Sequence, residues 1–298
     1  MAVVAFVVFL LLYLTPGDPA AILAGDAATS EDIKKIREKL GLDDPFLERF
    51  GQWLWRLLHG DLGVSIFTNL PVTRLIGQRI EPTLSLTVCT LVISVLVAGP
   101  LGVLAAARAG SWIDRAVMAF SVAGFSVPVF VIAYVLIMVF SIELEWLPVQ
   151  GYRPIKDGLW EWARHLVLPS IALGTVYIAL IARMTRAAML DVLAQDYVRT
   201  AQAKGLAPSA VLLRHALKNA AVPIATVIGI GIALLIGGAI VTETVFALPG
   251  IGRLTVDAIL RRDYPIIQGV VLLFSAAYVL INLAVDLSYM FFDPRIRY

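Results

Sequence analysis

Residues 196–223 read DYVRTAQAKGLAPSAVLLRHALKNAAVP and form the longest polar interruption in the apolar second half of the chain. Arg199, Lys204, Arg214 and Lys218 stand in this stretch against a single acid, Asp196. Apolar segments long enough to cross a bilayer lie on both sides, and a basic loop between two membrane spans is typical of the cytoplasmic side. The stretch therefore predicts a polytopic membrane protein with this loop inside the cell.

The pattern within the loop is helical. Tyr197, Val198 and Ala201 fall on one helix face, Gly205 is a typical helix end, and Pro208 with Ser209 can start the next helix. A short rigid helix at the membrane surface is suited to pass motion between a soluble partner and the spans. The alternative is an ordinary basic loop anchored by lipid phosphates.

The composition supports a membrane location. The chain of 298 residues is 59% hydrophobic and 15% charged, with a mean hydropathy of +0.85, whereas soluble domains are about half apolar and about a quarter charged. No stripe of basic residues lies apart from the predicted spans, so a nucleic-acid partner is not expected. The one cysteine, Cys89, lies in an apolar segment, and no Cys/His cluster has the spacing of metal ligands.

Hydropathy predicts an all-α fold with six spans, at about 1–17, 84–107, 116–140, 166–186, 222–242 and 267–290. The first apolar run, 2–14, is too short for about 30 Å of hydrocarbon. We therefore expect that this span lacks a few residues at its start or continues through Pro16. Gly99-Pro100 should kink the second span, and Pro128 lies within the third.

Residues 18–82 are more polar and predict a small helical subdomain outside the bilayer. Two amphipathic helices are expected in it, one between Ser30 and Gly41 and one between Asp44-Pro45 and Gly60. The apolar stripe of the second either packs on other spans or forms a docking surface for a substrate-delivery protein. The predicted organisation is a first span over 1–17, the subdomain over 18–82, and a core of five spans over 83–298 with its coupling loop at 187–221.

The distribution of charge predicts the orientation. The short loops assigned to the inside, 108–115, 183–220 and 293–298, hold ten Lys and Arg against four Asp and Glu. The short outer loops, 141–166 and 243–265, hold six against seven. By the positive-inside rule, both termini are expected in the cytoplasm.

Part of the loop resembles a sequence motif of a known family. Arg199-Thr200-Ala201, followed by three residues and Gly205, resembles the "EAA" loop of ABC importer permeases in its peptide-permease form. In that family the loop forms a coupling helix that docks in a groove of the ATPase subunit. Arg199 stands where the usual Glu is found and Thr200 where the first Ala is found, and Pro223 follows Gly205 at a longer distance than in sugar permeases.

The resemblance to the dipeptide/oligopeptide branch extends along the chain. It includes TPGDPA at 15–20, GLDDPFLERFGQWL at 41–54, EWLPVQGY at 145–152, ETVFALPGIGRL at 243–254 and FFDPRIR at 291–297. It implies the type I ABC importer permease fold in a bacterial inner membrane. It also implies a second homologous permease, two ATPase subunits, an extracytoplasmic solute-binding protein, and a substrate among dipeptides, oligopeptides, glutathione or nickel chelates.

The energy source is expected in the partners. The chain has no G-x-x-x-x-G-K-[ST] string and hence no P-loop for ATP, so ATP and Mg²⁺ are expected on the ATPase subunits, with no cofactor and no catalysis in this chain. The predicted ATPase contact comprises Tyr197, Arg199, Thr200, Ala201, Lys204, Gly205 and Leu206. Arg199 and Lys204 could pair with acids of that partner or with lipid phosphate.

Polar groups in or beside spans are candidates for the translocation path. Glu243, at the outer end of the fifth span, is either an interfacial carboxylate in contact with water or a charge that attracts a peptide amino terminus. Asn282 and Asp286 lie one turn apart on the sixth span. A structural ion pair between Asp286 and Arg183 or Arg186 is the favoured alternative to substrate contact.

Two other classes of protein compete with the importer. A self-sufficient secondary transporter or channel often shows internal repeats with broken helices, and no convincing repeat is present here. An intramembrane enzyme needs a buried catalytic group such as Ser/His or paired Asp, and spans two to five contain no such set.

Overall fold

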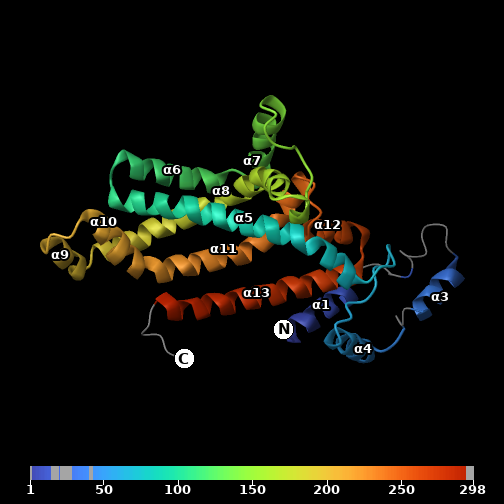
Figure 1. Ribbon diagram of the computed structural model, residues 1–298. Coiled ribbons are helices and arrows are strands. Elements are labelled where there is room, and N and C mark those ends of the chain that lie inside the picture. Colours follow the sequence, from blue (N-terminus) through green and yellow to red (C-terminus); the bar gives the residue numbers. More distant parts are fainter. Residues whose placement is uncertain (1, 15–19, 21–28, 40–42, 293–298) are drawn as a thin grey trace. The chain divides into compact units, whose positions relative to one another are not determined.

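The computed structural model describes residues 2–14, 20, 29–39 and 43–292 (Figure 1). Within these ranges the regular structure is helical, apart from an isolated β-bridge between Val64 and Pro71. The prediction of an all-α protein is therefore confirmed. The chain divides into two compact units, Met1–Glu81 with Arg253–Ala277 and Pro82–Gly252 with Tyr278–Tyr298.

The first unit contains the predicted pair of amphipathic helices. Its elements are α1 (Ala2–Leu14), α3 (Ser30–Lys39), α4 (Phe46–Leu58), the first turns of α5 (Val72–Ala107), most of α12 (Ile251–Arg261) and the first half of α13 (Tyr264–Phe292). Gly60, with φ of +80°, follows the end of α4 as predicted. The predicted helix end at Gly41 and the exit from the first span at 15–19 lie outside the described residues.

Aromatic side chains join α4 to α1. The ring of Phe9 lies 5.3–5.4 Å, between centroids, from the rings of Phe46, Phe50 and Trp53. Aromatic pairs at this separation add to the stabilisation from burial. Part of the apolar stripe of α4 thus packs on the first predicted span, whereas Leu58 at its end remains 73% exposed.

The second unit is built around α8 (Leu159–Leu193), which is the most buried of the long helices. It contacts α6 (Trp112–Ser126), α7 (Val129–Leu136) and α11 (Leu217–Val245). The remaining elements are the π-helix η1 (Ile137–Glu143), the 3-10 helix η2 (Ile155–Asp157), α9 (Asp196–Ala203), α10 (Pro208–Ala210), the π-helix η3 (Val211–Ala216), and the later parts of α5 and α13.

Small residues allow the neighbouring helices to approach α8 closely. A Cβ atom on Gly102 of α5 would lie 2.6 Å from the Cβ of Thr185 on α8, and one on Gly124 of α6 would lie 2.9 Å from the Cβ of Ala179. Because lipid tails are as apolar as the side chains, tight van der Waals packing at small residues is a main source of helix association in membranes. The centre of this unit is accordingly a closely packed bundle.

The prediction of six spans is not confirmed. Among the described residues, four helices are long and apolar enough to cross a membrane: Val72–Ala107, Leu159–Leu193, Pro208–Leu235 and Tyr264–Ser288. The pair Trp112–Ser126 and Val129–Glu143 makes a fifth if its two bent parts are counted as one span. Helix α1 has 13 residues and is about 20 Å long, short of the hydrocarbon thickness.

Helix α5 begins at Val72 and continues through Pro82, so it runs across the residue at which the outer subdomain is predicted to end, and that boundary stays a prediction. The third span was predicted as one helix over 116–140, but the chain bends by 103° between α6 and α7. Val127 precedes Pro128 and has an extended backbone, with φ −92° and ψ 122°, because the proline ring disfavours the helical conformation of the residue before it.

Candidate functional site

Helix α9 has one face fixed to its own chain and one face exposed. Val198 and Ala201 are 0% and 8% exposed and pack against Val211, the first residue of η3, with Val192 and Leu193 at the end of α8. This contact holds α9 against the elements on either side of it. The prediction of a helix in this loop is therefore confirmed, although Tyr197, expected on the apolar face, is 44% exposed.

Gly205 ends α9 in the predicted way. Its φ is +76°, a region that disfavours residues with a Cβ atom. The amide of Gly205 donates to the carbonyl of Gln202 at 2.9 Å, and the amide of Leu206 donates to that of Ala201 at 3.3 Å. This pair of bonds is the Schellman motif, which satisfies the last carbonyls of a helix. Pro208 then occupies the first position of α10, as expected.

Six of the seven residues predicted to contact an ATPase are exposed: Tyr197, Arg199, Thr200, Lys204, Gly205 and Leu206. Ala201 is the exception, because its side chain faces Val211 and is not accessible to a partner. The small size of Ala201 therefore serves packing within this chain. Arg199 forms an exposed ion pair of 3.7 Å with Asp196 on the same helix, a type of contact that contributes little to stability.

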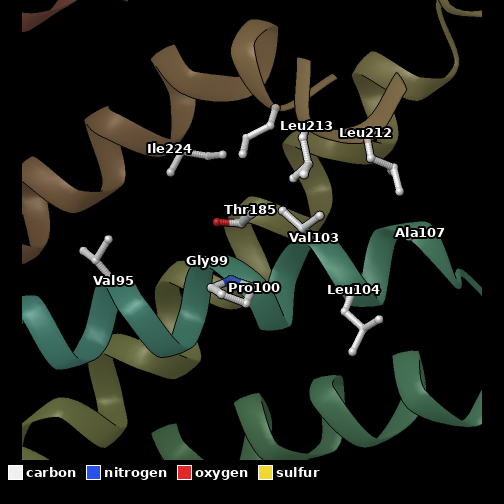
Figure 2. A pocket seen from close by; sticks show the side chains of 11 residues that line it. Val95, Gly99, Pro100, Val103, Leu104, Ala107, Thr185, Leu212, Leu213 and Ile224 are labelled. Carbon is white, nitrogen blue, oxygen red and sulfur yellow. The ribbon is translucent and has the colours of Figure 1, made fainter. Parts of the chain in front are cut away.

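An apolar cavity of about 640 Å³ adjoins the segment that follows α9 (Figure 2). Leu212 and Leu213 of η3 lie on one side of it, and Gly99-Pro100 of α5 lies on the other. The remaining lining residues are Val95, Val103, Leu104, Ala107, Thr185, Leu217 and Ile224. Because Val211 supports α9 and its two neighbours line the cavity, displacement of α9 would change the cavity wall directly.

Thr185 supplies a polar group among these apolar residues. It projects from α8, is 1% exposed, and its hydroxyl has no hydrogen-bond partner in the described part of the chain. Figure 2 shows its oxygen directed toward the space between α5 and α11. A buried hydroxyl without a partner is unfavourable by roughly 1–3 kcal/mol. No sequence signal marks this position, since a single threonine in a span is common.

Glu243 is completely buried, at 0% exposure, so neither expected contact, with water or with a solute, is available to it in this structure. The hydroxyl of Thr83 on α5 donates to a carboxylate oxygen of Glu243 at 2.6 Å. The same hydroxyl accepts the amide hydrogen of Ile251, the first residue of α12, at 2.8 Å. Glu243 and Thr83 therefore link the end of α11 and the first half of α5 to the start of α12. A role of Glu243 in the translocation path stays a prediction.

Gly250 and Gly252 make room for this carboxylate. A Cβ atom on Gly250 would overlap the carboxylate of Glu243, and one on Gly252 would lie 2.9 Å from its Oε2 atom. A carboxylate beside the first residues of a helix is also stabilised by the helix dipole. The LPGIG string at 248–252 is thus fitted around Glu243, and its two glycines were the sequence signal for such a close approach.

The two path candidates on α13 have different surroundings. The side-chain amide of Asn282 donates to the carbonyl of Tyr278 on its own helix at 2.8 Å, and Asp286 is exposed. The prediction of an ion pair between Asp286 and Arg186 is wrong, because Arg186 forms its ion pair with Asp114. Arg183, the other proposed partner, lies over the ring of Phe125 at 5.1 Å from its centroid.

The partner of Arg186 is Asp114, near the start of α6. The guanidinium binds both carboxylate oxygens, with Nη2 at 2.7 Å from Oδ2 and Nε in contact with Oδ1. Oδ2 also accepts the amide hydrogen of Gly110 at 2.9 Å. Asp114 is 4% exposed. A bidentate Arg–carboxylate ion pair is among the stronger polar contacts in proteins. It fixes the turn between α5 and α6 to α8.

Comparison with known families gives two matches that together cover nearly the whole chain. Residues 98–298 match the family described as binding-protein-dependent transport system inner membrane component. Residues 1–87 match the family of the N-terminal part of such membrane components. The division between the two lies within α5, a few residues beyond Thr83.

Several curated proteins are similar over the full length. A probable peptide ABC transporter permease protein of Sinorhizobium fredii is 57% identical over 298 residues, which is 100% of this chain and 95% of that protein. A glutathione transport system permease protein of Pectobacterium atrosepticum is 44% identical over 298 residues, which is again 100% of this chain and 95% of that protein. Among solved structures, the inward-facing MetNI methionine ABC transporter aligns with a TM-score of 0.61 at 19% identity, over 74% of this chain and 97% of that chain, which is a likeness of fold.

Proposed function

This chain belongs to the family of binding-protein-dependent transport system inner membrane components, and from that premise we propose that it forms half of the path of a peptide importer. It is the membrane-spanning permease subunit of an ATP-driven importer of a bacterial inner membrane. Such a permease works with ATPase subunits and with a solute-binding protein. The chemistry that drives transport therefore resides in those partners.

The solute is proposed to be a peptide or a peptide-like molecule. The similarity to the peptide permease of Sinorhizobium fredii and to the glutathione permease of Pectobacterium atrosepticum supports this class. We propose that a second, homologous permease completes the path and that two ATPase subunits bind ATP and Mg²⁺. The basic charge of the loops at 108–115 and 183–220 supports an orientation with α9 and both termini in the cytoplasm.

The observation that carries the assignment of the ATPase contact is the two-faced character of α9. Its apolar face is fixed on Val211, and its other face presents Tyr197, Arg199, Thr200 and Lys204 to solvent. A helix held in this way moves together with η3. A displacement of α9 by a partner is therefore passed on to η3. We propose that the exposed face docks in a groove of the ATPase.

The proposed mechanism is alternating access. ATP brings the ATPase subunits together, α9 and its counterpart on the second permease move with them, and the paired permeases switch from inward-facing to outward-facing. The binding protein then releases the solute, and hydrolysis resets the inward state. Movement of α9 is passed through Val211 to Leu212 and Leu213, which line the 640 Å³ cavity.

The experiment is reconstitution of the chain with its partner permease, ATPases and binding protein in liposomes, with peptide uptake and ATP hydrolysis measured together. Gly205→Trp should abolish uptake, because a bulky side chain beside the end of α9 obstructs docking. Gly110→Trp is the matched control: Gly110 also has a positive φ, of +80°, and neither glycine has an atom within 4 Å of an added Cβ.

The control should leave uptake within about twofold of the parent, since it introduces the same backbone strain in the turn between α5 and α6, outside the predicted ATPase contact. Normal uptake by Gly205→Trp would refute the docking of α9. Uptake by the chain alone, without ATPases and without ATP, would refute the importer and favour a self-sufficient secondary transporter.

A further inference from the structure

The break between α6 and α7 redirects the chain before it has crossed a bilayer. Helix α6 has 15 residues and is therefore about 22 Å long, whereas the hydrocarbon core is about 30 Å thick. After the 103° bend at Val127-Pro128, α7 and η1 add no length along the direction of α6. Figure 1 shows α7 directed away from the axis that α6 and α8 share.

One face of the α7–η1 segment, Val129–Glu143, is apolar and uncovered. Phe130, Tyr134, Met138 and Ile142 recur every four residues and are 47%, 59%, 54% and 59% exposed. This exposed stripe contains no charged residue. An uncovered row of this kind is unfavourable in water.

A second row of residues on the segment, beside the stripe, packs on the other helices of the second unit. Ala133, Ile137 and Ser141 recur with the same spacing of four and are buried, and α7 contacts α8 and α11. One side of the segment is thus fixed to the spanning helices. The apolar stripe lies outside this contact, since its residues are 47–59% exposed.

Two features indicate that lipid covers the stripe. It is continuous along the chain with the exposed apolar residues of α6, which include Phe120 and Phe125, at 42% and 45% exposure. Beyond it come Trp146 and Trp160, which are 64% and 73% exposed, and tryptophan is enriched where hydrocarbon meets the lipid headgroups.

We propose that α7–η1 is an interfacial segment: it lies parallel to the bilayer plane, with its stripe in the acyl chains of one leaflet and Trp146 and Trp160 at the headgroups. The segment then extends beside α8 and α11 in the plane of the membrane, and it does not form the second half of a span. The inference depends on the membrane location of the chain and is independent of its solute and of its ATPase contact.

The test measures the depth of single nitroxide labels in liposomes, using the full chain in complex with its partner subunits. Cys89, the one cysteine of the chain, is first replaced by alanine. Labels are then placed at 134, 138 and 142 on α7–η1, and at 88, 92 and 96 on α5 as a matched series. The α5 positions have the same spacing, lie on a spanning helix, and carry side chains that are 55%, 49% and 68% exposed.

Depth is obtained from the ratio of the accessibilities to oxygen and to a water-soluble nickel chelate. Along α5 the depth should change by about 6 Å per step, hence about 12 Å over the series. Along α7–η1 it should change by less than about 4 Å over the series, which allows for a tilt of about 20°. All three labels on α7–η1 should be accessible to oxygen.

A depth change on α7–η1 as large as that on α5 would overturn the proposal, because the segment would then cross the membrane. Labels shielded from both oxygen and nickel would also overturn it, because a protein surface would then cover the stripe, and labels open to nickel would show that it faces water. If a labelled variant does not assemble, Val131 and Val135, which lie beside the stripe and are 38% and 52% exposed, replace it.

Discussion

Glu243 and Thr83 lie 160 residues apart in the sequence and are joined by a hydrogen bond of 2.6 Å between two buried side chains. Thr83 at the same time accepts the amide hydrogen of Ile251. One hydroxyl therefore connects α5, the end of α11 and the start of α12. A buried carboxylate needs such partners, because an ionised group without them is strongly disfavoured in a low-dielectric interior.

Replacement of Thr83 by valine should destabilise the chain substantially. The change keeps the shape of the side chain but removes its hydrogen bonds to Glu243 and Ile251, and the loss of each hydrogen bond lowers stability by about 0.5–1.5 kcal/mol. The measurement is the free energy of unfolding in mixed micelles. Thr83→Ser, which keeps the hydroxyl, should recover most of the loss.

Thr87→Val serves as the control for this prediction. The hydroxyl of Thr87 lies one turn further along α5 and donates to the carbonyl of Thr83 at 2.8 Å, within the same helix. Its loss should change the free energy of unfolding by less than about 1 kcal/mol. Equal effects of Thr83→Val and Thr87→Val would contradict a special role of the Thr83–Glu243 link.

The space around Glu243 leads to a second prediction. Gly250→Ala should displace the Glu243 carboxylate, because the new methyl group would overlap it. Displacement should lower the free energy of unfolding by about 1–3 kcal/mol, the usual effect of overpacking. Gly77→Ala is the control: nothing lies within 4 Å of an added Cβ there, and alanine favours the interior of α5. A tolerated Gly250→Ala would show that the carboxylate can move at little cost.

The ion pair of Asp114 and Arg186 should contribute more than an ordinary surface pair. The Asp114 side chain is 5% exposed and the Arg186 side chain is 24% exposed, and removal of one member of a buried pair costs about 3–5 kcal/mol. A double-mutant cycle of Asp114→Asn and Arg186→Gln, followed by unfolding, should give a coupling energy of about 1–3 kcal/mol. A coupling near zero would show that solvent screens the pair.

Within the polar loop, local sequence signals predicted the helix and its end. The polar loop at 196–223, the glycine at 205 and the proline at 208 have local causes, namely charge, positive φ and the fixed φ of proline. These features appear in the structure at the predicted residues. Positions fixed by backbone chemistry can therefore be predicted without knowledge of what packs against them.

Pairings across the fold could not be predicted in this way. Asp286 and Asp114 were both available to Arg186 by sequence, and only the packing of α6 on α8 selects Asp114. Glu243 resembled an interfacial acid because its neighbours in sequence are threonines. Its burial depends on Thr83 and Gly250, which other elements bring to it. The bend at Pro128 was underestimated for the same reason, since hydropathy predicts the length of an apolar segment but not the direction in which its helices run.

The anchoring of α9 gives the last prediction. Val198 is 0% exposed and packs on Val211, so Val198→Asp would bury an ionised carboxylate without a partner. Because that state is strongly disfavoured, the helix should instead detach from η3 while the spans remain folded. Limited proteolysis in proteoliposomes should then cut the segment 194–207 at least tenfold faster, and peptide uptake should fall while ATP hydrolysis continues.

Thr200→Asp is the matched control for this detachment. It adds the same charge to the same helix on the exposed face, where a carboxylate stays in water and the contact with Val211 is unchanged. Proteolysis of this variant should proceed at the parental rate. If both variants were cut equally fast, charge on α9 would be the cause, and the rigid connection from Val198 through Val211 to the cavity wall would lose its support. If neither were cut faster, α9 would be held by contacts other than its apolar face, and Val198 could not be the residue through which motion of the helix reaches η3.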